Sequence, residues 1–152
     1  MDELKIVSGV KLSFVEFSEF LSLTEKDFVP PLCSRINVSE YYHKLSQNAE
    51  FIACYDGCSL VGLMAVYCND KVNKTTHGSF LAVLSQYRGL KIAPRILEEV
   101  EKMSLLKGMC RIKLDTNNVI AYKCYLKNGY KLVETQYLPE YKLDRYVLEK
   151  EL

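Results

Sequence analysis

The sequence predicts an α/β (α+β) domain with a mixed, mostly antiparallel twisted sheet flanked by helices. Two observations predict this class. β-rich runs separated by turn signals fill residues 51–83, which is typical of antiparallel hairpins. Strand-like and helix-like segments then alternate, and a strand-helix-strand crossover implies a parallel pair within the sheet. Because a chain of 152 residues can bury a sizeable core, we expect a single domain over residues 1–152.

Two helices are expected in residues 1–48. Apolar residues run at near-helical spacing from Phe14 to Phe28, and Pro30-Pro31 cannot continue a helix. Ser39 can cap a second, short helix through Gln47, since a serine hydroxyl accepts an amide hydrogen bond in the first turn.

The rest of the chain shows both strand and helix periodicities. An amphipathic pattern predicts a helix over 92–107, stopped by Gly108, and Asn118 can cap another helix that ends at Asn128-Gly129. Strands are expected at 51–55, 60–68, 76–83, 110–114, 130–137 and 145–150.

Composition excludes several classes of function. Lys plus Arg is 20 and Asp plus Glu is 19, without a basic block, so we expect no nucleic-acid partner. The first five residues resemble no secretion signal, and the longest apolar run, 60–68, contains a glycine, so we expect a cytoplasmic protein without a membrane span. Six cysteines without a C-x-x-C pair are interpreted as reduced thiols, and no metal site is expected.

The turn from Leu84 to Lys91 is a candidate anion site. A turn that leads from a strand into a helix offers free backbone amides and the positive end of a helix dipole. Gly89 lets the backbone approach an anion, while Arg88 and Lys91 add positive charge. The same residues equally describe a solvated turn with two chance cations, and the turn matches neither the P-loop nor the dinucleotide-binding pattern.

A second segment favours the anion site over the solvated turn. Residues 118–130 match N-x-x-A-x-x-x-Y-x-x-x-G-F/Y throughout, at Asn118, Ala121, Tyr125, Gly129 and Tyr130. Together with the preceding turn, this segment resembles the GNAT superfamily of N-acetyltransferases. The resemblance in motifs runs from residue 80 to 130, which it marks as an acetyl-CoA-binding core, and it places the first 48 residues on the acceptor side.

The resemblance implies which residues bind acetyl-CoA. The family's Q/R-x-x-G-x-G/A turn wraps the pyrophosphate of CoA, and the strand before it supplies backbone amides to the acetyl carbonyl and the pantetheine arm. Lys91 departs from the pattern, because the family has Gly or Ala there; its side chain could crowd the pyrophosphate or add a cation to it. The implied cofactor-binding residues are Leu81, Ala82, Val83, Gln86, Arg88, Gly89, Leu90, Lys91, Ile92, Ala93, Asn118 and Tyr125.

Roles in catalysis follow from the resemblance and from the chemistry of acyl transfer. The family's tyrosine lies beside the thioester sulfur, so Tyr125 is the candidate acid that protonates the departing thiolate; the alternative is a core aromatic residue. Asn118 could equally be a plain helix cap. His77 is the candidate base, although a solvent-exposed histidine at a strand end is an equal interpretation, and Glu134 and His43 are weaker candidates.

These inferences predict an acetyl-CoA-dependent N-acetyltransferase that acts by direct attack on the primary amine of a small molecule. Arg35, Tyr41 and Tyr137 are the candidate acceptor-binding residues, and aromatic rings plus a cation suit an amino-sugar nucleotide. A peptide or protein amine is an alternative acceptor. A non-catalytic acyl-CoA sensor is the alternative function, and the chain is expected to be a monomer or a homodimer.

Overall fold

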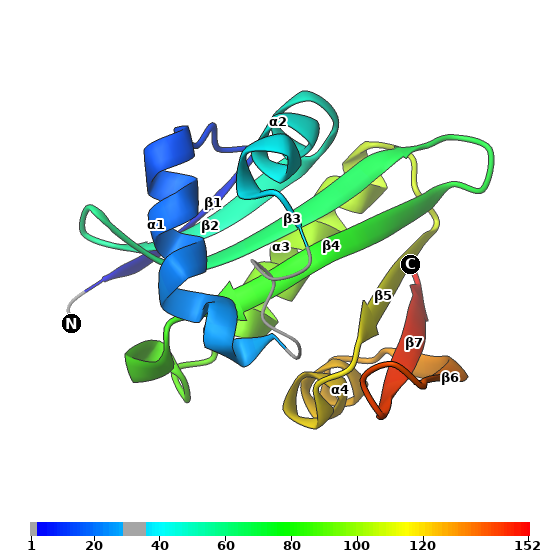
Figure 1. Cartoon of the computed structure of the whole chain (residues 1–152). Coiled ribbons are helices and arrows are strands. Elements are labelled where there is room, and N and C mark those ends of the chain that lie inside the picture. The colour runs from blue at the N-terminus through cyan, green and yellow to red at the C-terminus, as the bar shows by residue number, and fades with distance from the viewer. Residues whose placement is uncertain (1–2, 29–35) are drawn as a thin grey trace.

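The computed structural model describes residues 3–28 and 36–152, and within them seven strands form one mixed sheet (Figure 1). The strand order is β1-β2-β3-β4-β5-β7-β6, and only β4 and β5 pair in parallel. The strands are β1 (Leu4–Ser8), β2 (Glu50–Asp56), β3 (Ser59–Asp70), β4 (Thr75–Val83), β5 (Arg111–Thr116), β6 (Lys131–Leu138) and β7 (Leu143–Glu151). The predicted fold class is confirmed.

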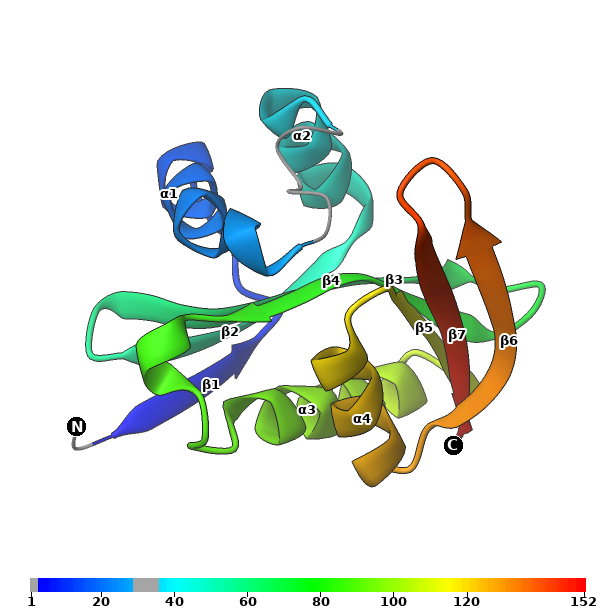
Figure 2. The ribbon, with the colours of Figure 1, turned by 60° about the horizontal axis from the view of Figure 1, so that its bottom comes forward.

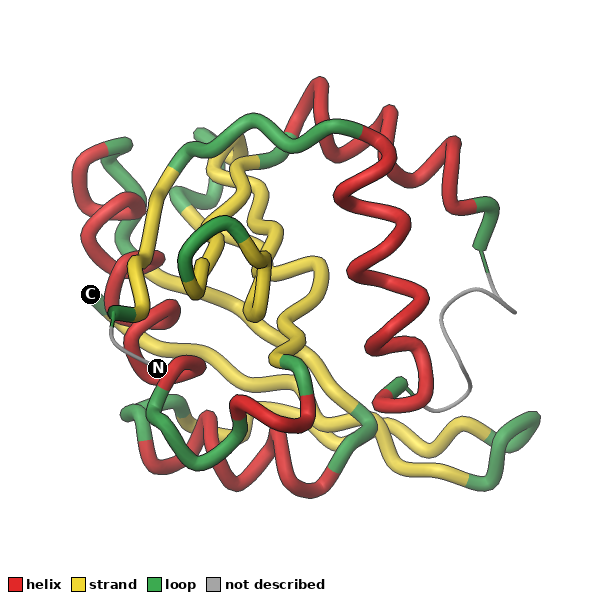
Figure 3. Tube along the Cα trace, turned by 90° about the vertical axis from the view of Figure 1, so that its left-hand side faces the viewer, coloured by secondary structure: helices red, strands yellow, loops and turns green. Residues whose placement is uncertain are grey.

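Helices cover both faces of the sheet (Figures 2 and 3). The helices are α1 (Phe14–Thr24), α2 (Val38–Asn48), α3 (Ile92–Leu106) and α4 (Val119–Lys127), with short 3₁₀ turns η1 (Glu25–Asp27) and η3 (Ser85–Tyr87). Figure 2 shows α1 and α2 on one face and α3 and α4 on the other. No described helix is long and apolar enough to cross a bilayer.

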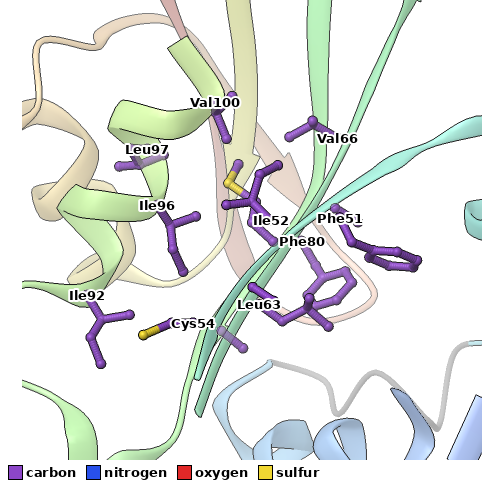
Figure 4. Close-up of a cluster of buried hydrophobic side chains, with 14 of the residues drawn as sticks. Phe51, Ile52, Cys54, Leu63, Val66, Phe80, Ile92, Ile96, Leu97 and Val100 are labelled. Atoms are coloured by element: carbon purple, nitrogen blue, oxygen red, sulfur yellow. The ribbon is translucent and has the colours of Figure 1, made fainter. Parts of the chain in front are cut away.

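The buried core has one layer on each face of the sheet. Figure 4 shows the α3 side chains Ile92, Ile96 and Val100 directed at one face of the strands, and all three are almost fully buried, as is Leu97. On the opposite face the Phe80 ring packs edge-on against the Phe17 ring of α1, with centroids 6.1 Å apart. The apolar stripe that predicts the helix over 92–107 is therefore the stripe that α3 buries.

A glycine allows α3 to lie close against β3. A Cβ atom on Gly62 would come within 2.9 Å of Cγ2 of Ile92 and 3.3 Å of Cδ1 of Ile96. Both contacts are tighter than ordinary van der Waals distance. The missing side chain thus lets the first turns of α3 lie directly on the sheet, which sets the position of the helix N-terminus.

β4 and β5 diverge after a short parallel ladder. They pair only from Thr75↔Arg111 to His77↔Lys113, although β4 continues to Val83 and β5 to Thr116. Figure 1 shows the two strands separating, with α4 beside the opening. The second half of β4 is therefore paired on its β3 side only.

Two local predictions are corrected by the structure, and one strand was missed. The first helix ends at Thr24 and continues as η1, so it does not reach Phe28. The second helix is capped by Asn37, whose side chain accepts from the Glu40 amide at 3.0 Å, so Ser39 is not the cap. The strand β1 was not predicted, because five residues at an edge carry too little periodic pattern to be recognised.

Candidate functional site

The unpaired edge of β4 exposes backbone hydrogen-bonding groups to the opening. The Leu84 amide donates to the Val61 carbonyl at 2.9 Å, so the backbone amide of residue 84 points to β3. In an antiparallel pair successive residues alternate in direction, and therefore the backbone groups of Val83 and Leu81 point away from β3. Within residues 3–28 and 36–152, the outward backbone groups of two of the three predicted strand residues, Leu81 and Val83, therefore have no strand partner, while Ala82 bonds to β3.

A β-bulge lies where β4 and β5 begin to diverge. The register with β3 shifts between Ala65↔Phe80 and Val66↔Gly78, so Ser79 is the extra residue. Such a bulge re-aims side chains, and here Ser79 and Phe80 both face the α1–α2 side. The Ser79 hydroxyl is hydrogen-bonded to the Tyr41 hydroxyl of α2.

The N-terminus of α3 carries no side-chain cap. Lys91 precedes the helix in the left-handed conformation, with φ 61° and ψ 30°, and makes no capping hydrogen bond. The amides of Ile92 and Ala93 have no partner within the helix, and Pro94 has no amide hydrogen to donate. Gly89 is also left-handed, with φ 81°. The turn therefore presents free donors at the positive end of the α3 dipole.

Two contacts hold this turn against the rest of the protein. The Tyr87 hydroxyl donates to Asp56 Oδ2 at 2.6 Å, and that hydrogen bond, followed by partial burial, raises the pKa of Tyr87. The Arg88 guanidinium lies 2.5 Å from the carboxylate of Asp27. Gln86 and Leu90 are exposed at the same turn.

Asn118 caps α4 through its side-chain oxygen. Its Oδ1 accepts from the Ile120 amide at 2.8 Å and from the Ala121 amide at 3.3 Å. Its Nδ2 donates to the Asp27 carbonyl at 3.3 Å. The capping interpretation of Asn118 is confirmed, while a role in cofactor binding stays a prediction.

Tyr125 lies on the inner face of α4 and is 5% exposed. Its ring is 5.9 Å from the ring of Tyr130. Burial, with smaller effects from Cys124 and Asp115, raises the pKa of the Tyr125 phenol well above its ordinary value. The phenol is therefore protonated at neutral pH and able to donate a proton.

His77 lies at the closed end of the opening. Thr76 bonds to Ser104 of α3 at 2.7 Å, so the neighbouring His77 faces the α1–α2 side, as Ser79 does. Nε2 of His77 is 3.0 Å from the Asp70 carboxylate. This hydrogen bond, and then those from Asn73, lower the pKa of Asp70 to about 2. His43 and Glu134 are exposed on α2 and β6.

The predicted acceptor residues are only partly assembled. Tyr41 contacts β4 through Ser79. Tyr137 is 60% exposed on the edge strand β6, with β7 and β5 between it and β4. Arg35 lies outside the described residues. The structure therefore groups Tyr41 with the opening and leaves Tyr137 at the far edge of the sheet.

Four residues at the site were not found from the sequence: Asp27, Asp56, Ser79 and Tyr87. Each joins segments far apart in the chain, and none occupies a specified position of a motif. Only Tyr87 carried a local signal, because it lies inside the turn already selected. In residues 3–28 and 36–152, no group of three or more His, Cys, Asp or Glu side chains is placed to hold a metal ion, and the five described cysteines are free.

Comparison with known proteins identifies the family and the fold. The family model described as "Acetyltransferase (GNAT) family" matches residues 17–130. No curated protein matches the chain.

Solved structures share the fold. An acetyltransferase of the GNAT family from Streptococcus pneumoniae is 19% identical over 99% of each chain, with a TM-score of 0.79. PaiA N-acetyltransferase from Thermoplasma acidophilum, in complex with coenzyme A, is 18% identical over 99% of each chain, with a TM-score of 0.72. An aminoglycoside 6'-N-acetyltransferase complexed with coenzyme A is 17% identical over 97% of this chain and 96% of its own, with a TM-score of 0.77.

Proposed function

This chain belongs to the GNAT family of acetyltransferases, and from that premise we propose that it transfers the acetyl group of acetyl-CoA to the primary amine of a small molecule by direct attack. The observation that carries the proposal is the divergence of β4 from β5. It leaves backbone groups of Leu81 and Val83 free beside a helix N-terminus with free amides. An extended chain of amides that ends in a pyrophosphate suits both features.

In the proposed site the pyrophosphate, the pantetheine arm and the thioester of acetyl-CoA each have protein groups of matching chemistry. The turn from Gly89 to Ala93, with Arg88, binds the pyrophosphate through backbone amides and a guanidinium. The free edge of β4 hydrogen-bonds the pantetheine arm and the thioester carbonyl. Lys91 is exposed and adds a cation beside the phosphates.

The reaction requires one bond to form and one to break. The neutral amine attacks the thioester carbonyl, the C–N bond forms, and the C–S bond breaks with departure of the thiolate. Tyr125, whose raised pKa keeps the phenol protonated, donates a hydrogen bond to the thiolate as it departs, and the thiolate takes up a proton from this phenol or from water. The proton of the attacking amine leaves to His77, held by Asp70, either directly or through water.

The acceptor site in this proposal lies on the α1–α2 face at the bulge. Tyr41 and Ser79 supply hydroxyl groups there. Such groups suit a polar small molecule, for which an amino-sugar nucleotide is our first candidate. Solved structures with this fold include both an aminoglycoside 6'-N-acetyltransferase and a ribosomal-protein-S18-alanine N-acetyltransferase, so both classes of acceptor belong in the test.

The test is an assay of CoA release from acetyl-CoA with a panel of amines, with acetylated products identified by mass spectrometry. The panel contains an amino-sugar nucleotide, an aminoglycoside, a polyamine and a short peptide with a free N-terminus. We expect turnover with a sugar amine. Turnover with the peptide alone would replace the small-molecule acceptor, and CoA binding without turnover on any amine would favour the sensor function.

A further inference from the structure

Asp27 touches both helix starts that flank the proposed acetyl-CoA site. Its carboxylate lies 2.5 Å from Arg88 in the turn before α3. Its backbone carbonyl accepts from Asn118 Nδ2, at the cap of α4, at 3.3 Å. Asp27 itself belongs to η1, on the segment between α1 and α2, far from both partners in the sequence.

We propose that Asp27 is a positioning residue that competes with the pyrophosphate of CoA for Arg88 and thereby speeds the release of CoA. This inference rests on the proposed function, because it requires that the turn binds the pyrophosphate. The Arg88 side chain is 52% exposed, so a phosphate can reach it from solvent. A carboxylate and a phosphate repel each other, so Arg88 gives up part of its contact with one when it binds the other.

The strength of the ion pair suits a reversible competitor. Exposed pairs of this kind are weak, and Asp27 is 34% exposed. A weak competitor does not prevent binding, but it lowers the affinity and shortens the lifetime of the bound state. In many enzymes product release limits the turnover rate, so Asp27 would favour turnover at the expense of affinity.

The two contacts of Asp27 can be separated experimentally. Asp27→Asn removes the negative charge but keeps the backbone carbonyl that bonds Asn118. The position of η1 against α4 is therefore retained, and only the competition for Arg88 is lost. Glu25→Gln is a matched control, because it removes the same charge from the same short turn.

The experiment measures CoA affinity by calorimetry and CoA dissociation by stopped-flow displacement, for the wild type, Asp27→Asn, Glu25→Gln, Arg88→Gln and the double variant Asp27→Asn/Arg88→Gln. We expect Asp27→Asn to bind CoA roughly two- to fivefold more tightly, with slower dissociation, which corresponds to the weak energy of an exposed pair. Glu25→Gln should change neither value, and the gain from Asp27→Asn should be clearly smaller once Arg88 is replaced. S-acetylpantetheine, which lacks the pyrophosphate, should bind equally to the wild type and to Asp27→Asn.

Unchanged or weaker CoA binding by folded Asp27→Asn would overturn the competitor role, and so would an equal gain in the Arg88→Gln background. If the wild type binds no CoA at all, the proposed function fails and this inference fails with it. If the wild type binds CoA and Arg88→Gln weakens that binding, the proposed site stands and the Asp27 measurements alone decide the inference.

Discussion

The N-termini of α3 and α4 flank the same opening, but they satisfy their backbone amides in opposite ways. At α4, Asn118 accepts hydrogen bonds from two amides of the first turn. At α3, Lys91 makes no capping bond and adopts a left-handed conformation. One helix start satisfies its own donors, and the other leaves them for a ligand. In the proposed site this difference gives the two helices different roles: α3 would contribute backbone groups, and α4 would contribute a side chain, Tyr125.

The largest effect should come from removing that side-chain group. Tyr125→Phe keeps the ring but deletes the hydroxyl, so we expect CoA affinity to change little and kcat to fall by about 10²- to 10⁴-fold, the usual cost of losing a positioned acid. Steady-state kinetics on an amine that the panel identifies, beside a CoA titration, gives both values.

A matched control is available on the neighbouring ring. The buried Tyr130 hydroxyl has no hydrogen-bond partner within residues 3–28 and 36–152, so Tyr130→Phe should leave kcat unchanged. Equal turnover of wild type and Tyr125→Phe would mean that Tyr125 only packs in the core. In that case α4 would contribute no catalytic group to the site.

The next effect tests the backbone contribution of α3. Gly89→Glu puts a carboxylate where the phosphates are expected, and like charges in contact cost several kcal/mol, so CoA affinity should fall by about 100-fold or more. Gly89→Ala is the control for backbone strain, since a Cβ there meets no atom within 4 Å and adds no charge. Calorimetry that finds intact binding by folded Gly89→Glu would remove the turn from the site.

A smaller effect is expected at the α4 cap. Asn118→Ala deletes the acceptor of two amide hydrogen bonds, and loss of a cap typically costs about 1 kcal/mol of the free energy of unfolding. For a domain of this size the melting temperature should fall by about 2–4 °C. Asn118→Asp keeps an acceptor and should restore most of the loss. Thermal denaturation followed by circular dichroism checks this, and a melting temperature unchanged in Asn118→Ala would show that the cap is dispensable.

The smallest effect concerns the strained residue before α3. Lys91→Gly relieves a left-handed conformation that costs a non-glycine residue about 1–2 kcal/mol, but it also increases the entropy of the unfolded chain. We expect a net stabilisation of about 0.5 kcal/mol and slightly weaker CoA binding at low salt, because one cation is lost. Chemical denaturation and calorimetry at two salt concentrations measure the two changes. A less stable variant would contradict the assignment of strain to Lys91.

Most of the cofactor side could be predicted from the sequence. The apolar stripe of α3, the Asn118 cap and the Gly129 stop are short-range patterns, so residues close in the chain specify them. The segments that we expect on the acceptor side were harder to predict from the sequence. The second helix starts one residue after Asn37, and its cap was misplaced because Asn37 and Ser39 both carry side chains that can cap. The edge strand β1 is too short to show a clear periodic pattern, and it is recognised through its pairing with β2.

The amino-acid sequence by itself determined the fold class, the order of most elements and the family resemblance, because periodicity, capping and motif spacing act over a few neighbouring residues. Tertiary structure alone decided where β4 leaves β5, how the bulge turns Ser79 toward Tyr41, 38 positions away in the chain, and that Asp27 meets both helix starts. These contacts depend on how closely the helices and strands pack, as α3 does against Gly62. A pattern of neighbouring residues does not specify that packing.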